Sequence, residues 1–191
     1  MQPCEHGHDH PHIKPIIATV QIGGHTAGTM RANIFDAAEM REQGGPAQMW
    51  QECQNFDAEH DGTKLDKIEN YLANESFPGK RQVQIDTAAV VLFVDEVWLE
   101  RVRRRQGLGL WAVDELIRQM APARGCMVIL LQAGPITREG TADDSEAHGK
   151  ITRHWKKLGF SEWSDSDDAW LCLVAEERVE YENLVPGKLA S

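Results

Sequence analysis

Apolar and polar residues alternate between positions 13 and 35, and this period of two predicts a pair of β-strands. Gly23 and Gly24 interrupt the alternation and predict the turn between the strands, because a tight hairpin needs residues that adopt a positive φ. Strands are also predicted at 88–99 and 126–131. Their apolar residues are continuous over 88–94 and 126–131, which is typical of strands covered on both faces, and Asp95 and Glu96 interrupt the first run near its end. Further strands are predicted at 82–86, 160–163 and 169–175.

Apolar positions spaced three and four residues apart predict helices elsewhere. Two helices are expected between Ala37 and Phe77, one over 107–120, and one from His148 to Leu158, with Gly159 as its C-terminal cap. Residues 133–145 are expected to form a loop. This order of elements predicts a single α/β or α+β domain, bounded by a His-rich flexible tail at 1–12 and an exposed acidic tail at 179–191.

Composition limits the functions that this fold could serve. The 191 residues are 41% hydrophobic and 26% charged, with a formal net charge of −10, which argues against a general nucleic-acid binder. The four cysteines form no CxxC pair, and no apolar stretch reaches the roughly 20 residues that span a bilayer. The N-terminus lacks the apolar core of a signal peptide, so a cytoplasmic location without membrane contact is expected.

Histidines stand at every second position from His6 to His12. In an extended chain they would share one face and could hold a transition metal. A metal site usually draws ligands from more than one element, so the favoured interpretation is a tail without a functional metal.

The stretch from Val90 to Met120 predicts a strand, a turn with three arginines at 103–105 and a helix. Helix N-termini and glycine-rich turns favour anions, and the arginines strengthen that preference for phosphate. The GxGxxA spacing that begins at Gly107 would also suit a dinucleotide fold, but the glycines do not directly follow the strand and the next strand ends in Gln132 instead of an acidic residue. A nicotinamide-dependent oxidoreductase is therefore the weakest interpretation.

The turn also fits the pattern Arg/Gln-x-x-Gly-x-Gly/Ala over 104–109, and here the chain resembles the GNAT superfamily of acyl-CoA-dependent N-acyltransferases. The family's apolar–aromatic–apolar triplet before the motif is matched at 97–99, and its aromatic-x-x-Leu-Gly-Phe sequence at 155–160. The resemblance covers about residues 82–175 and implies a mostly antiparallel sheet flanked by helices, splayed between its two central strands. It implies that acetyl-CoA is the cosubstrate.

The resemblance also assigns the residues that would bind the cofactor. The motif turn would cradle the coenzyme A pyrophosphate, and the triplet would pair with the pantetheine arm and polarise the thioester carbonyl. These residues are Val97, Trp98, Leu99, Arg104, Arg105, Gln106, Gly107, Leu108, Gly109 and Leu110.

Transfer to an amine requires a base, and Glu96 is the first choice and Asp95 the second, because both precede the strand end where the acceptor should approach. Adjacent strand residues face opposite ways, so one of the two at most is expected to point into the site. The family often uses a tyrosine as general acid, but Trp155 occupies that position, with His154 the available substitute and His148 a weaker one. Cys126 is expected to be a buried core residue and not a nucleophile.

The resemblance therefore implies an N-acetyltransferase that moves an acetyl group from acetyl-CoA to a primary amine by direct transfer in a ternary complex. The acceptor, a small molecule or a peptide, is not specified by the sequence, and a homodimer is left open. The alternative is a catalytically silent domain of the same fold that binds acyl-CoA or a protein partner, which the missing tyrosine would explain.

Overall fold

The structure is a computed structural model that describes residues 13–39, 42, 88–120, 126–134, 144–162, 170–179 and 181. The predicted tail at 1–12, most of the predicted helices at 37–77 and the predicted strand at 82–86 lie outside these residues. A helical turn does begin at Ala37, where Asp36 caps it by accepting a hydrogen bond from the Glu39 N–H at 3.2 Å.

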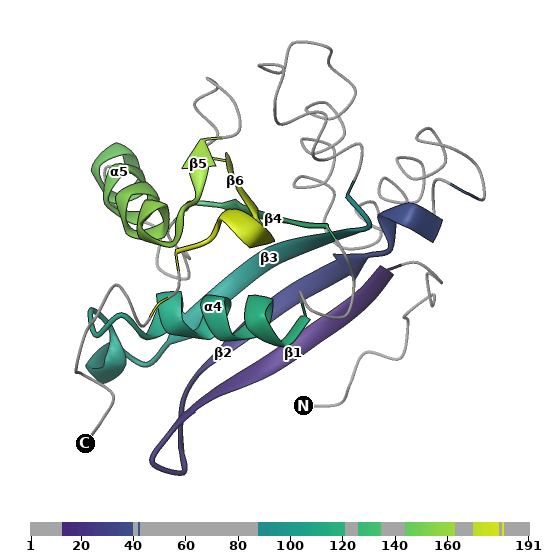
Figure 1. Cartoon of the computed structure of the whole chain (residues 1–191). Helices are drawn as coiled ribbons and strands as arrows, with labels where there is room; N and C mark the ends of the chain where they lie inside the picture. The colour runs from purple at the N-terminus through teal and green to yellow at the C-terminus, as the bar shows by residue number, and fades with distance from the viewer. Residues whose placement is uncertain are drawn as a thin grey trace.

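The described elements form a mixed α+β fold around a six-stranded, mostly antiparallel sheet (Figure 1). The strands lie in the order β1-β2-β3-β4-β6-β5, and only β3 and β4 run parallel. The strands are β1 (Ile13–Ile22), β2 (His25–Phe35), β3 (Val90–Leu99), β4 (Met127–Gln132), β5 (Ser161–Glu162) and β6 (Trp170–Val174). The coarse fold class is therefore as predicted.

The β1–β2 hairpin is confirmed. Gly23 and Gly24 form its turn with φ values of 57° and 80°, a conformation that side chains disfavour. The strands pair from Ile13 and Phe35 to Ile22 and His25, and along β1 buried or half-buried positions alternate with exposed ones. The alternation marks a strand with one face toward the core.

Strand β3 changes character halfway along. Val90 to Val94 are all buried, as predicted for a central strand, and pair in parallel with Met127 to Leu131 of β4. This parallel ladder stops at Val94, while β3 continues to Leu99 paired with β2 alone among the described strands. In the β2–β3 register Arg31 lies opposite Glu96 and Ala32 opposite Val94, so Asp95 is the extra residue of a β-bulge.

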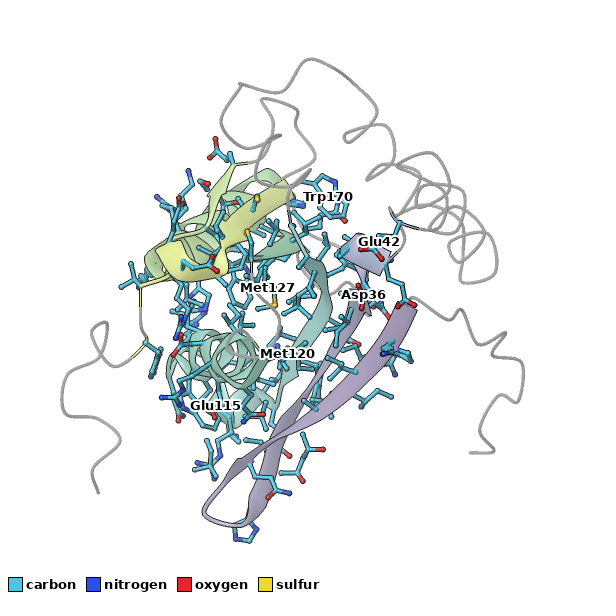
Figure 2. All side chains as sticks on the ribbon, turned by 45° about the vertical axis from the view of Figure 1, so that its right-hand side comes forward. Asp36, Glu42, Glu115, Met120, Met127 and Trp170 are labelled. Atoms are coloured by element: carbon cyan, nitrogen blue, oxygen red, sulfur yellow. The ribbon has the colours of Figure 1, made fainter. Side chains whose placement is uncertain are left out.

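Helix α4 (Leu108–Met120) covers one face of the sheet and encloses the main core (Figure 1). Its apolar face meets side chains from the central strands, and Figure 2 shows Met120 and Met127 in the layer between helix and sheet. Glu115 points away from the sheet in the same view. The helix connects two parallel strands, as βαβ crossovers do.

The second described α-helix, α5 (Asp144–Trp155), begins inside the stretch that was predicted as loop. It continues as the 3-10 helix η3 (Lys156–Leu158) and ends at Gly159, whose φ of 97° confirms the predicted cap. The predicted closing hairpin is also present, with Ser161 opposite Cys172. None of the helices in the described part of the chain has the length and apolarity that crossing a bilayer requires.

The segment after β6 differs from the exposed tail that the sequence predicted. Glu176 and Glu177, in the 3-10 helix η4 (Ala175–Glu177), are exposed, but Tyr181 is only 2% exposed. Arg178 Nε donates to Asp114 Oδ1 of α4 at 3.0 Å, and the Tyr181 N–H donates to Asp114 Oδ2 at 3.3 Å. The prediction of an exposed tail is therefore wrong at Tyr181, because a buried carboxylate of α4 holds the segment against the helix.

Replacing Leu92 by alanine should lower the free energy of unfolding by about 2–5 kcal/mol, because Leu92 is 0% exposed and lies at the centre of the sheet. Ile17→Ala on β1 is the matched control, since Ile17 is 76% exposed and should change stability by less than about 0.5 kcal/mol. Urea unfolding measures both, and equal losses in the two variants would contradict this position of the core.

Candidate functional site

The arginine-glycine turn between β3 and α4 is held in shape by its own side chains. The 3-10 helix η1 (Arg101–Arg103) follows β3, and the Arg104 Nε donates back to the Leu99 carbonyl at 2.9 Å. Gln106 Nε2 donates to the Val102 carbonyl at 2.9 Å. These two bonds close the turn before the helix starts.

Two residues of the turn have a left-handed backbone conformation and lie close together in the sequence. Gly107 has a φ of 80°, and Arg105 has a φ of 63°, which is uncommon for a residue with a side chain. A non-glycine residue in this region costs about 1–2 kcal/mol and persists where the surroundings impose it, often at functional sites. Alternation of left-handed residues with others turns successive N–H groups to one side and creates an anion-binding concavity.

Six consecutive N–H groups in this turn, those of residues 105–110, have no acceptor within the described parts of the chain. The Trp111 N–H is the next one along and already donates to the Gly107 carbonyl at 3.1 Å. The first turn of α4 also contains no acidic residue that would offset the positive end of the helix dipole. These features favour an anion at the turn.

The structure brings most of the predicted cofactor-binding residues together. Those at 104–110 form the turn and the start of α4, and Gly109 lies beside the free end of β3, since a Cβ at Gly109 would be 3.8 Å from Val97 Cγ1. Arg104 and Arg105 are exposed, so their charges face solvent at the turn. The Leu99 carbonyl, however, already accepts the Arg104 Nε bond, which the sequence did not predict.

The two predicted carboxylates differ in their surroundings. Glu96 lies across from Arg31 of β2, with its Oε2 3.7 Å from Arg31 Nε, and its side chain is 17% exposed against 60% for the arginine. Asp95 is the bulged residue and is exposed. Glu96 is therefore the carboxylate with a defined, half-buried position near the end of the parallel ladder.

Trp155 occupies the position predicted for a general acid, and His154 is the substitute that the sequence offered. Trp155 is buried and packs edge-on against Phe160, with ring centroids 6.1 Å apart. A Cβ at Gly109 would be 3.8 Å from His154 Nε2 and 3.9 Å from the Trp155 ring, so both residues border the start of α4. Burial, reinforced by the nearby Lys157 charge, lowers the pKa of His154 below its ordinary value. His154 is therefore neutral at neutral pH.

The remaining candidates, His148 and Cys126, have contacts with other parts of the fold. His148 lies on α5 beside Gly134, where a Cβ would be 3.4 Å from His148 Nε2. Cys126 is half-buried, not buried as predicted, because it precedes β4. Burial and the Glu176 charge raise the pKa of the Cys126 thiol, which disfavours the thiolate that a nucleophile requires.

Asp114 and Tyr181 also belong to this region, although neither was predicted as a site residue. Asp114 is 4% exposed, although it lies among apolar positions of α4 such as Val113 and Ile117. An acidic residue within an apolar helical face indicates a buried partner, so a signal for Asp114 was present. Tyr181 gave no such signal, because its neighbours in the sequence are acidic or polar.

Comparisons with known proteins do not assign the chain to a family. No family model matches it, and no curated protein is significantly similar to it. Within the described ranges, no three His, Cys, Asp or Glu side chains gather in a way that could hold a metal ion, and the histidines at 6–12 lie outside those ranges.

Replacing His154 by glutamine should reduce the loss of stability that the protein shows in mild acid. The pKa of His154 is lowered in the fold, so the unfolded chain takes up a proton near 6.5 while the folded chain does so only at a lower pH. Stability from the neutral imidazole is therefore full above pH 6.5 and is lost as pH falls through the folded-state pKa.

Urea unfolding at several pH values between about 7.5 and about 5 measures this effect. His25→Gln, at the exposed β1–β2 turn, is the control for removing one histidine. The same pH slope in wild type and His154→Gln would contradict the assignment.

Proposed function

We propose that the protein is an acyl-CoA-dependent N-acyltransferase that transfers an acetyl group from acetyl-CoA to a primary amine. The observation that carries the proposal is the run of N–H groups at 105–110 without acceptors in the described structure, at a helix N-terminus and beside exposed arginines. Such an arrangement suits a diphosphate, because one phosphate alone would leave several donors unused.

The sheet next to the turn supports coenzyme A over other diphosphates. Beyond Val94, β3 has no described strand partner on its β4 side, and this edge runs to Leu99, just before the turn. An unpaired strand edge can pair with an extended ligand that carries amide groups, as the pantetheine arm does. The resemblance of the motifs at 97–99, 104–109 and 155–160 to the GNAT superfamily points to the same ligand.

The proposed chemistry is direct transfer in a ternary complex. The neutral amine attacks the thioester carbonyl carbon, the carbon–sulfur bond breaks, and coenzyme A leaves as the thiolate while the nitrogen loses a proton. Glu96 accepts that proton directly or through a water molecule. Its ion pair with Arg31 would hold the carboxylate in place, and a cationic acceptor could compete for it. One backbone N–H group near Trp98 and Leu99 would polarise the carbonyl oxygen.

The alternative is a catalytically silent domain that binds acyl-CoA. Trp155 favours it, because this buried indole stands where the family often has a tyrosine and has no proton to give the leaving thiolate. The neutral His154 beside it is a weak acid for the same purpose. If the domain is catalytic, no side chain of the protein protonates the departing thiolate, which leaves unprotonated or takes a proton from water.

Isothermal titration with coenzyme A should show binding that Arg105→Gln weakens about threefold to tenfold, since one exposed charge beside the phosphates is lost. The matched control is Arg118→Gln, which removes an exposed charge from the last turn of the same helix and should leave the affinity unchanged. Binding to the wild type should also weaken as salt increases. No binding of coenzyme A by the intact protein would refute the proposal.

Release of thiol from acetyl-CoA over a panel of amines, polyamines, aminoglycosides and peptides separates the enzyme from the silent domain. Glu96→Gln should lower kcat about 10²-fold with coenzyme A affinity unchanged, because only proton removal is affected. Asp95→Asn, the exposed neighbour, should change kcat by much less. Coenzyme A binding without thiol release for any amine would favour the silent domain.

A further inference from the structure

The C-terminal segment places a buried phenol at the arginine-glycine turn. A Cβ built on Gly107 would lie 2.5 Å from the Tyr181 hydroxyl oxygen and 3.4 Å from its ring, so the phenol occupies the place of the missing side chain. Tyr181 is 2% exposed, yet among the described residues its hydroxyl has no hydrogen-bond partner. The hydroxyl oxygen is not one of the fully buried polar atoms that lack a partner, so it lies at the turn with a proton that a ligand oxygen can accept.

Two contacts to Asp114 fix the position of this phenol. The Asp114 carboxylate accepts bonds from both the Arg178 guanidinium and the Tyr181 backbone N–H, one carboxylate oxygen for each. Between these two residues in the sequence, the Val179 N–H donates to the Leu158 carbonyl at 2.9 Å. Arg178 and Tyr181 therefore lie against α4, and the Tyr181 hydroxyl reaches Gly107, which precedes the N-terminal end of this helix.

We propose that Tyr181 completes the diphosphate site by donating a hydrogen bond from its hydroxyl to a phosphate oxygen held at the turn. The inference rests on the proposed function, because it takes coenzyme A as the ligand. The backbone N–H groups and the phenol come from segments about 70 residues apart and meet at Gly107. A ligand oxygen at this point gives the hydroxyl the acceptor that the described chain does not supply.

The surroundings keep the phenol in the form that can donate. Burial raises the pKa of Tyr181 above its ordinary value, so the hydroxyl stays protonated at neutral pH. Gly107 has a second reason to be glycine, since any side chain there would displace the hydroxyl in addition to the strain at a φ of 80°. Asp114 acts as a positioning residue, because it reaches the turn only through the segment that it holds.

Titration of coenzyme A into the Tyr181→Phe variant tests the inference, since phenylalanine keeps the ring and removes the hydroxyl. We expect coenzyme A to bind about tenfold more weakly, because the variant lacks one hydrogen bond to a charged group. The control is Val179→Ala in the same segment, whose side chain is exposed and should not affect binding.

An affinity of Tyr181→Phe equal to wild type would overturn the inference and leave the proposed function intact. Tighter binding would also overturn it, because the hydroxyl would then obstruct the site. Absence of coenzyme A binding in the wild type would refute the proposed function and the inference together.

A spectroscopic measurement does not depend on how well Tyr181→Phe folds. The chain has two tyrosines, so a Tyr71→Phe background leaves Tyr181 as the single phenol. Coenzyme A should shift the ionisation of that phenol, followed by tyrosinate absorbance, to higher pH, since a bond to a phosphate oxygen and its negative charge both favour the protonated form. An unchanged titration curve on saturation with coenzyme A would overturn the inference.

Discussion

The candidate site depends on where the parallel ladder between β3 and β4 ends. Five residue pairs, from Val90 with Met127 to Val94 with Leu131, hold the two strands together, and β3 then continues with β2 alone among the described strands. The bulge at Asp95 lies at this transition and shifts the alternation of side chains, so that Val97 packs against the main core. Within the described structure, the last residues of β3 have no strand on their β4 side, and they lie beside the start of α4, where the N–H groups without a described acceptor are found.

The C-terminal segment adds a second constraint, which acts through a buried charge. Moving a carboxylate out of water is unfavourable unless charged or polar groups replace the lost hydration, and Asp114 finds both in Arg178 and the Tyr181 N–H. Residues far apart in the chain are thereby brought to one side of α4. The arrangement links the last described residues of the chain to the turn at Gly107.

Much of the site could be predicted from local sequence. The turn at 104–110 follows from its residue spacing, and the structure places Gly109 beside Val97 of β3, the strand that also carries the carboxylates at 95 and 96. The Arg104 bond to the Leu99 carbonyl could not be predicted, because it depends on how η1 redirects the chain after β3. The half-buried state of Cys126 and the lowered pKa of His154 also depend on neighbours from other elements. Burial of a single side chain is a property of packing and is not encoded by its sequence neighbours.

By itself, the sequence determined the elements whose signals are local: the β1–β2 hairpin, the buried first half of β3, α4 and the cap at Gly159. Periodicity and positive-φ glycines act within a few residues, so these features hold wherever the elements are placed. Only the tertiary structure decided that the pairing of β3 with β4 ends at Val94, that Glu96 pairs with Arg31, and that Tyr181 reaches Gly107. Each of these joins residues from different elements, and such contacts depend on sheet register and on the burial of Asp114, which form only when the whole core packs.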